Sequence, residues 1–118
     1  MKTHTNEVLV YYNKEQRTAK QVLALAHTVS SNVKEVEYHK TRMSSTMWHR
    51  LLNRLDLRPK DLLNRADPYY QSNIRGRDFD REGWLNILIR NPDLIKAPIA
   101  VKGQRAVLCS NPTDIYQL

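Results

Sequence analysis

Hydrophobic residues near the start of the chain change from a strand pattern to a helix pattern and back. Residues 7–12 form a β-branched and aromatic run, which is typical of a buried strand. Residues 15–28 predict a helix, because apolar side chains recur at the spacing of one helix face, at Ala19, Val22, Leu23 and Ala26. Residues 33–39 predict a second, short strand. We expect this β-α-β unit to be parallel and right-handed.

The next helix is predicted to begin at Ser44 or Ser45, because a serine hydroxyl can accept a hydrogen bond from the first turn. Its expected inward face consists of Met47, Trp48, Leu51, Leu52 and Leu55. The opposite face is polar and carries His49, Arg50, Asn53 and Arg54.

Shorter elements are predicted to follow. Pro59 fits the first turn of a short helix over residues 60–65, and residues 67–77 are predicted to form a loop. Asp80 can cap a longer helix that ends at Arg90. The inward side chains of this helix are expected to be Trp84, Leu85, Leu88 and Ile89.

The end of the chain predicts a β-hairpin. Residues 99–102 and 105–109 have strand character and are joined by a tight turn, and residues 113–118 are predicted to form a short helix. A parallel first unit and an antiparallel hairpin together predict a four-stranded mixed sheet with helices on both faces. We therefore expect an α/β protein of thioredoxin-like fold, with a helical insertion in the middle and one domain over residues 1–118.

Net charge, the length of apolar runs and the cysteine count limit the functions that the chain can have. The chain of 118 residues has 19 Lys and Arg against 12 Asp and Glu, and its net charge of +7 favours acidic partners. No apolar run approaches the roughly 20 residues that span a bilayer, and residues 1–6 do not resemble a signal peptide. We expect a cytoplasmic protein without a membrane partner. A single cysteine, Cys109, excludes an internal disulfide and any paired-cysteine motif. No metal site is expected, since the spacing of His27, His39 and His49 is not metal-like.

Basic residues are concentrated in the predicted helical middle, at Lys40, Arg42, Arg50, Arg54, Arg58, Lys60 and Arg65. Two interpretations remain open: a solvated charged face, or a surface that binds an acidic protein. The four-residue spacing of Arg50, Arg54 and Arg58 makes these three the candidate partner surface. Nucleic acid is a less favoured partner.

Several segments in the second half follow one another in a specific order. They are residues 61–65 (DLLNR), 68–69 (PY), 84–92 (WLNILIRNP), 94–101 (LIKAPIAV) and 110–118 (SNPTDIYQL). In this order the chain resembles the arsenate reductase family of the glutaredoxin-coupled type, which also contains the Spx transcriptional regulators. The resemblance extends from Val8 to Leu118. It implies a thioredoxin-like fold and a thiolate nucleophile in the first loop, at the head of the first helix.

The residues of that implied site are not kept. Asn13 fits the family's first loop, but Gln16 stands at the position of the cysteine, and its neighbour Arg17 does not restore a thiol. Glutamine has no nucleophilic atom for the attack on an oxyanion. The resemblance also implies three arginines around the oxyanion, and their positions hold Asn64 (next to Arg65), Ala97 and Ser110. It further implies a cis peptide bond before Pro98.

The sequence therefore predicts a non-catalytic member of this family that works by binding, as a regulatory or interaction module. The alternative is a glutathione- or glutaredoxin-linked oxidoreductase that retains activity through Cys109. The position of Cys109 after an apolar strand instead favours a structural role in the core. No cofactor is expected. A remnant pocket at Gln16 and Arg17 could hold glutathione or a small anion only weakly without the flanking arginines.

Overall fold

The computed structural model describes residues 7–38, 40–41 and 43–118. Its sheet has four strands, β1 (Glu7–Tyr12), β2 (Asn32–Glu37), β3 (Ile99–Lys102) and β4 (Arg105–Leu108). Their order is β2-β1-β3-β4, in which β1 and β2 are parallel and β3 is antiparallel to both β1 and β4. The predicted mixed sheet is therefore confirmed. The left-handed conformation of Gly103, with φ of +61°, closes the hairpin between β3 and β4.

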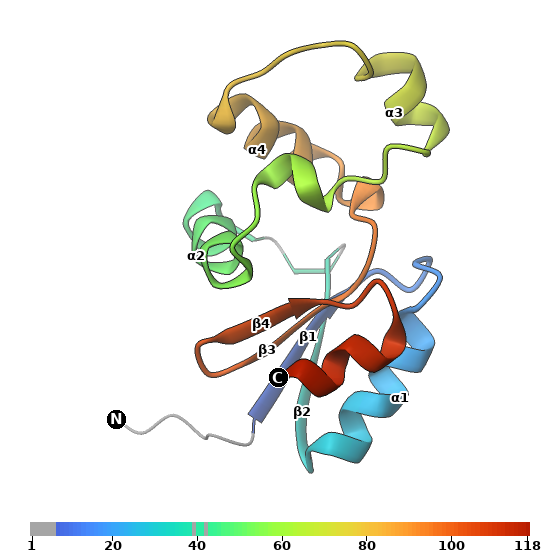
Figure 1. Cartoon of the computed structure of the whole chain (residues 1–118), viewed down its shortest axis with the longest axis vertical. Coiled ribbons are helices and arrows are strands. Elements are labelled where there is room, and N and C mark those ends of the chain that lie inside the picture. Colours follow the sequence, from blue (N-terminus) through green and yellow to red (C-terminus); the bar gives the residue numbers. More distant parts are fainter. Residues whose placement is uncertain (1–6, 39, 42) are drawn as a thin grey trace.

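Side chains alternate between the two faces of the sheet and create two separate cores. Val8 and Val10 pack in one core with helix α1 (Ala19–Val29) and the terminal 3₁₀ helix η3 (Pro112–Gln117). Leu9 and Tyr11 point to the other face, where they pack against the helical middle of the chain. Figure 1 shows this division, with α1 and the red η3 beside the sheet and the remaining helices above it.

The helical middle contains α2 (Ser45–Leu55), η1 (Pro59–Leu62), α3 (Pro68–Asn73), α4 (Arg81–Arg90) and η2 (Pro92–Leu94). The prediction of a loop over residues 67–77 is wrong for its first part, which forms α3. The Asp67 side chain accepts a hydrogen bond from the backbone N–H of Tyr69, and Pro68 occupies the first helical position. Burial of Tyr70 and Ile74 then holds this short helix against the core.

Helix α2 begins as predicted, because the Ser44 hydroxyl accepts a hydrogen bond from the backbone N–H of Met47 at 3.2 Å. Its buried row is Trp48, Leu51 and Leu52, with Leu55 half-buried at its end. The placement of Met47 on the inward face is wrong, since this residue is 38% exposed. Contact with the sheet selects the row that runs through residues 48 and 52 and leaves Met47 at its outer edge.

Several element boundaries also differ from the sequence prediction. Helix α1 begins at Ala19 rather than residue 15, because residues 13–18 form hydrogen-bonded turns. The predicted helix 60–65 is the 3₁₀ turn η1, after which Leu63 pairs with Ile95 as an isolated β-bridge. Strand β4 ends at residue 108 rather than 109, and β2 ends at residue 37 rather than 39. His39 and Arg42 lie outside the described residues.

None of the helices in the described part of the chain is long and apolar enough to cross a membrane.

Candidate functional site

The loop between β1 and α1 is tied to the segment that leads into β3. Asn13 is buried, and its side-chain amide donates a hydrogen bond to the carboxylate of Asp93 at 3.2 Å. The side-chain oxygen of Asn13 accepts a hydrogen bond from the backbone N–H of Glu15 at 3.1 Å. One buried side chain therefore fixes the shape of the loop and also holds it against η2.

Gln16 makes a second connection between the same two segments. Its side-chain oxygen accepts a hydrogen bond from the backbone N–H of Asn13 at 2.9 Å, and its Nε2 donates to the carbonyl oxygen of Ile95 at 3.0 Å. Both ends of the amide are thus bonded to backbone groups of the protein. At the position where the resemblance implies a reactive thiolate, the chain has a side chain with a structural role.

A hollow of about 700 Å³ lies beside this loop, and we call it the first-loop hollow. Its lining residues are Asn13, Glu15, Gln16, Arg17, Asn64, Asp67, Asp93, Ile95 and Lys96. Three of these side chains are carboxylates and two are cations, so the lining does not form a positively charged cradle. An oxyanion that leaves water needs several charge-assisted donors, and here acidic groups oppose it.

Cys109 is fully buried, and it lies on the α1 side of the sheet. Burial raises the pKa of its thiol to about 12, and the nearby carboxylate of Asp114 acts in the same direction. The backbone of this residue also anchors α1, because its carbonyl oxygen accepts a buried hydrogen bond from the Thr18 hydroxyl at 3.0 Å. A neutral, enclosed thiol is a poor nucleophile. The position of Cys109 agrees with the predicted structural role.

Comparisons with known proteins identify the family. The ArsC family model matches residues 11–118. The chain belongs to the ArsC family. No curated protein matches the chain by sequence.

Solved structures show the same fold. A putative arsenate reductase from Yersinia pestis is 25% identical, with a TM-score of 0.83 over 94% of this chain and 99% of that one. An arsenate reductase from Vibrio cholerae is 20% identical, with a TM-score of 0.84 over 98% of this chain and 100% of that one. An arsenate reductase related protein from Brucella melitensis is 17% identical, with a TM-score of 0.70 over 98% and 97% of the two chains. The thioredoxin-like fold of this ArsC family member is thereby established.

The structure brings some of the predicted site positions together and separates others. Asn64 lines the first-loop hollow with Asn13, Gln16 and Arg17, and its side-chain oxygen accepts a hydrogen bond from Ala66 N–H at 3.1 Å. Arg65 lies on a neighbouring hollow. The other three positions are absent from the described lining: Ala97 and Pro98 are buried, and Ser110 is exposed beyond β4.

The prediction of a cis bond between Ala97 and Pro98 is wrong, because this peptide is trans. Trans is the more stable isomer of an X–Pro bond by about 0.5–1 kcal/mol, so cis requires support from its surroundings. In the trans form the Pro98 carbonyl accepts a hydrogen bond from the backbone N–H of Cys109 at 2.8 Å, which extends the pairing of β3 and β4.

Sequence reasoning missed the acidic side of the hollow, which consists of Asp67, Asp93 and Glu15. Asp67 and Asp93 lie far from the first loop in sequence. Asp93 follows Pro92 in the first turn of η2, where an acidic side chain is common at a helix start, so its sequence context gave no sign of contact with Asn13.

The candidate partner surface on α2 is only partly available. Arg50 and Arg54 are exposed, and Arg54 lies near enough to Tyr11 to oppose the rise that burial causes in the pKa of that tyrosine. Arg58 is instead paired with Asp61 at 3.4 Å. Although burial acts to raise it, the pKa of Asp61 is lowered by hydrogen bonds from the backbone and side chain of Arg58. Within the described residues, no cluster of side chains could hold a metal ion.

Proposed function

We propose that this ArsC family protein is non-catalytic and acts by binding an acidic protein partner. The observation that carries the proposal is the Gln16 side chain, which bonds to Asn13 N–H and to the Ile95 carbonyl at the position where a thiolate nucleophile would be needed. A glutamine amide can neither attack an oxyanion nor form a mixed disulfide. The mixed charge of the first-loop hollow argues further against oxyanions and against glutathione as a cofactor.

The alternative of a residual oxidoreductase would have to use Cys109, the one cysteine of the chain. Burial of that thiol and its raised pKa of about 12 argue against this role, because the thiolate is the reactive form.

A coupled assay tests the loss of catalysis. Arsenate-dependent oxidation of NADPH is measured with glutathione, glutaredoxin and glutathione reductase, for the wild type and for Cys109→Ala. An active arsenate reductase serves as the positive control. We expect no turnover above background from either form. Arsenate-dependent turnover by the wild type that Cys109→Ala removes would establish the oxidoreductase instead.

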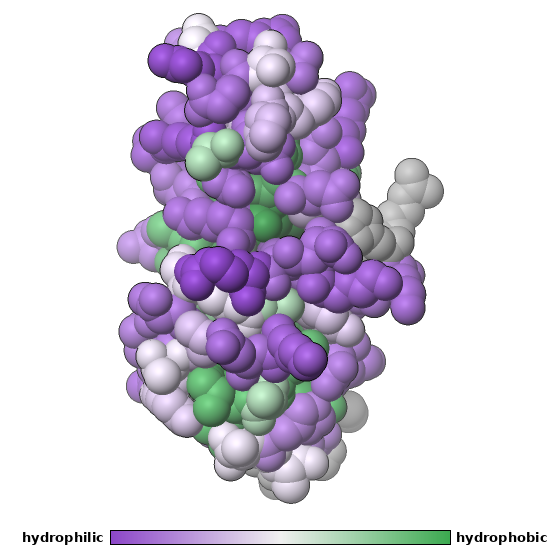
Figure 2. All heavy atoms as spheres, turned by 90° about the vertical axis from the view of Figure 1, so that its right-hand side faces the viewer, coloured by the Kyte–Doolittle hydropathy of each residue, from purple (hydrophilic) through white to green (hydrophobic). Residues whose placement is uncertain are grey.

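The surface for the acidic partner is proposed to be the exposed face of α2 that carries Arg50 and Arg54. Two of the large exposed apolar residues, Val29 and Tyr116, line one small hollow of about 90 Å³. Met47 on α2 and Tyr69 on α3 are not part of that lining. Figure 2 shows the side of the molecule away from α2, which is mainly hydrophilic with some hydrophobic areas, so this side does not offer a broad apolar surface either. Charge is therefore a better basis for partner binding than a broad apolar surface.

A charge-reversal pull-down from the native host tests this surface. Arg50→Glu with Arg54→Glu should abolish recovery of the partner, and rising salt should release it from the wild type, because the screening length is about 10 Å at 0.1 M. The matched control is Lys20→Glu with Lys34→Glu, which makes the same change in net charge on exposed positions of α1 and β2. Equal recovery by both double variants would show that the α2 face is only solvated surface.

A further inference from the structure

We propose that a second hollow, between α3 and α4, binds a small organic anion that carries a flat ring. This site is independent of the proposed protein-binding function, because it lies on other elements than the α2 face and the first loop. Its volume is about 510 Å³, which is within the range of small-molecule sites. We call it the α3–α4 hollow.

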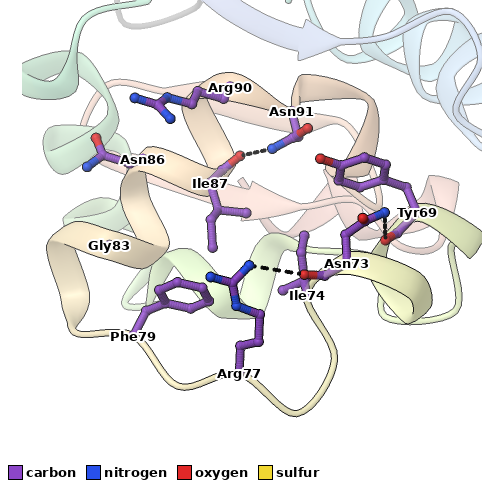
Figure 3. A pocket seen from close by; sticks show the side chains of 10 residues that line it. All are labelled: Tyr69, Asn73, Ile74, Arg77, Phe79, Gly83, Asn86, Ile87, Arg90 and Asn91. Atoms are coloured by element: carbon purple, nitrogen blue, oxygen red, sulfur yellow. Dashed lines mark hydrogen bonds between the residues drawn. The ribbon is translucent and has the colours of Figure 1, made fainter.

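The lining of the α3–α4 hollow joins an apolar floor to basic and amide groups. Its residues are Tyr69, Asn73, Ile74, Arg77, Phe79, Gly83, Asn86, Ile87, Arg90 and Asn91. Two of these residues are arginines, and none is acidic. Figure 3 shows the side chains of Arg77, Ile87 and Tyr69 directed toward the space between the two helices, whereas those of Asn86 and Arg90 extend away from α3. Such a lining is complementary to a negatively charged ligand.

Arg77 is held in position at the mouth of the hollow. Its guanidinium lies over the ring of Phe79, 5.1 Å from the centroid. Phe79 is itself fixed by edge-to-face packing on Trp84, with centroids 5.0 Å apart and planes at 78°. The guanidinium donates one long hydrogen bond, to the carbonyl oxygen of Asn73 at 3.4 Å. Its other N–H donors have no partner among the described residues, so a preplaced cation can bind an anion.

Flat and apolar surfaces beside this cation favour a ring over a bare inorganic anion. Tyr69 is 51% exposed, so its ring offers a face for stacking, and Ile74 and Ile87 supply an apolar floor. An aromatic carboxylate, sulfonate or phosphate has both a negative charge for Arg77 and a flat ring for the apolar surfaces of the hollow.

The probe for this site is 1-anilinonaphthalene-8-sulfonate, a flat anion, and its uncharged analogue N-phenyl-1-naphthylamine serves as the charge control. Fluorescence titration gives the affinity, and two-dimensional NMR of the ¹⁵N-labelled full chain locates the site. We expect saturable binding of the sulfonate with shifts confined to residues 69–91, and clearly weaker binding of the analogue. Shifts centred elsewhere, or equal affinity for the two probes, would overturn the proposal.

Arg77→Gln should weaken binding of the sulfonate about tenfold, the change expected when one charge-assisted hydrogen bond is lost. The matched control is Arg81→Gln, which removes an equal charge from an exposed position of α4 that does not line the hollow. NMR spectra and thermal melts must show that both variants remain folded, because this probe also binds loosened proteins. Equal affinities for the two variants would exclude Arg77 from the site and overturn the proposal.

Discussion

The first-loop hollow and the α3–α4 hollow are similar in size but differ in how their polar groups are used. In the first-loop hollow, the side chains of Asn13 and Gln16 bond to other parts of the protein, and carboxylates outnumber cations. In the α3–α4 hollow, two arginines face no acidic lining residue and Asn86 is unbonded among the described residues. Size alone therefore does not identify a binding site. Polar groups left without a protein partner are the better indication of a ligand.

This difference has a physical basis. A side chain that bridges two backbone segments contributes to stability but cannot also bind a ligand without breaking those bonds. A fixed cation without an acidic partner, such as Arg77, contributes little to folding, and most of its N–H donors remain available for an anion. The first-loop hollow thus has the properties of a structural joint, whereas the α3–α4 hollow has those of a site.

The largest expected effect concerns the reactivity of Cys109, because burial in the core beside α1 raises the pKa of its thiol. At pH 8 a thiol with a pKa of about 12 is ionised about a thousandfold less than one with the ordinary pKa of 9.0. Labelling of the native protein with 5,5′-dithiobis(2-nitrobenzoate) should therefore be slower by at least this factor than labelling in urea. The rate should rise about tenfold for each pH unit. Native labelling as fast as in urea would show an accessible thiol and would reopen the oxidoreductase interpretation.

The next effect is on the free energy of unfolding, which should respond differently to substitutions in the two hollows. Gln16→Ala should lower the free energy of unfolding by about 1–3 kcal/mol, because it removes two hydrogen bonds and leaves the backbone groups of Asn13 and Ile95 without these partners. Asn86→Ala, an exposed amide in the other hollow, should change it by less than about 0.5 kcal/mol. Urea unfolding of the two variants measures both values. An equal loss of unfolding free energy in the two variants would show that the two hollows do not differ in their structural role.

The sheet and the absence of a cysteine from the first loop were predictable from the sequence, but the contacts made by the residues in that loop were not. Strand and helix periodicity identified β1, α1 and the closing hairpin, since these patterns are local. The pairing of Gln16 with Ile95 joins residues 79 positions apart, and no local pattern encodes it. Helix α3 was missed because a Pro-initiated helix of six residues is too short to show periodicity, and its stability comes from burial of Tyr70 and Ile74. The α3–α4 hollow depends on that helix and was missed with it.

A third, intermediate effect tests whether an unpaired polar group always indicates a ligand. The Tyr38 hydroxyl is buried and has no hydrogen-bond partner among the described residues, and burial raises the pKa of Tyr38 well above its ordinary value of 10.0. Tyr38→Phe should therefore raise the free energy of unfolding at pH 7 by about 1 kcal/mol, because it removes the cost of enclosing that hydroxyl.

The pH dependence of this variant has a definite sign. Because the pKa of Tyr38 is raised on folding, the wild type keeps its full stability below pH 10 and loses stability as the pH rises above 10, when only the unfolded state releases the proton. The advantage of the phenylalanine variant should grow over the same range, as followed by urea unfolding between pH 7 and 11. A loss of stability at pH 7 would mean that the hydroxyl has a bonding partner, and Tyr38 would then join Gln16 as a structural side chain.

The smallest expected effect concerns Arg77 in the absence of a ligand. Arg77→Gln removes its contact with the Phe79 ring and one long hydrogen bond, both at an exposed position, so the free energy of unfolding should change by less than about 1 kcal/mol. The same variant should lose most of its affinity for the aromatic sulfonate, so stability and binding should respond independently. Urea unfolding with and without the probe measures this separation, because a ligand stabilises only the folded state that binds it. If Arg77→Gln instead destabilised the free protein as much as Gln16→Ala does, Arg77 would be a structural residue. Its unpaired donors would then no longer distinguish the α3–α4 hollow from the first-loop hollow.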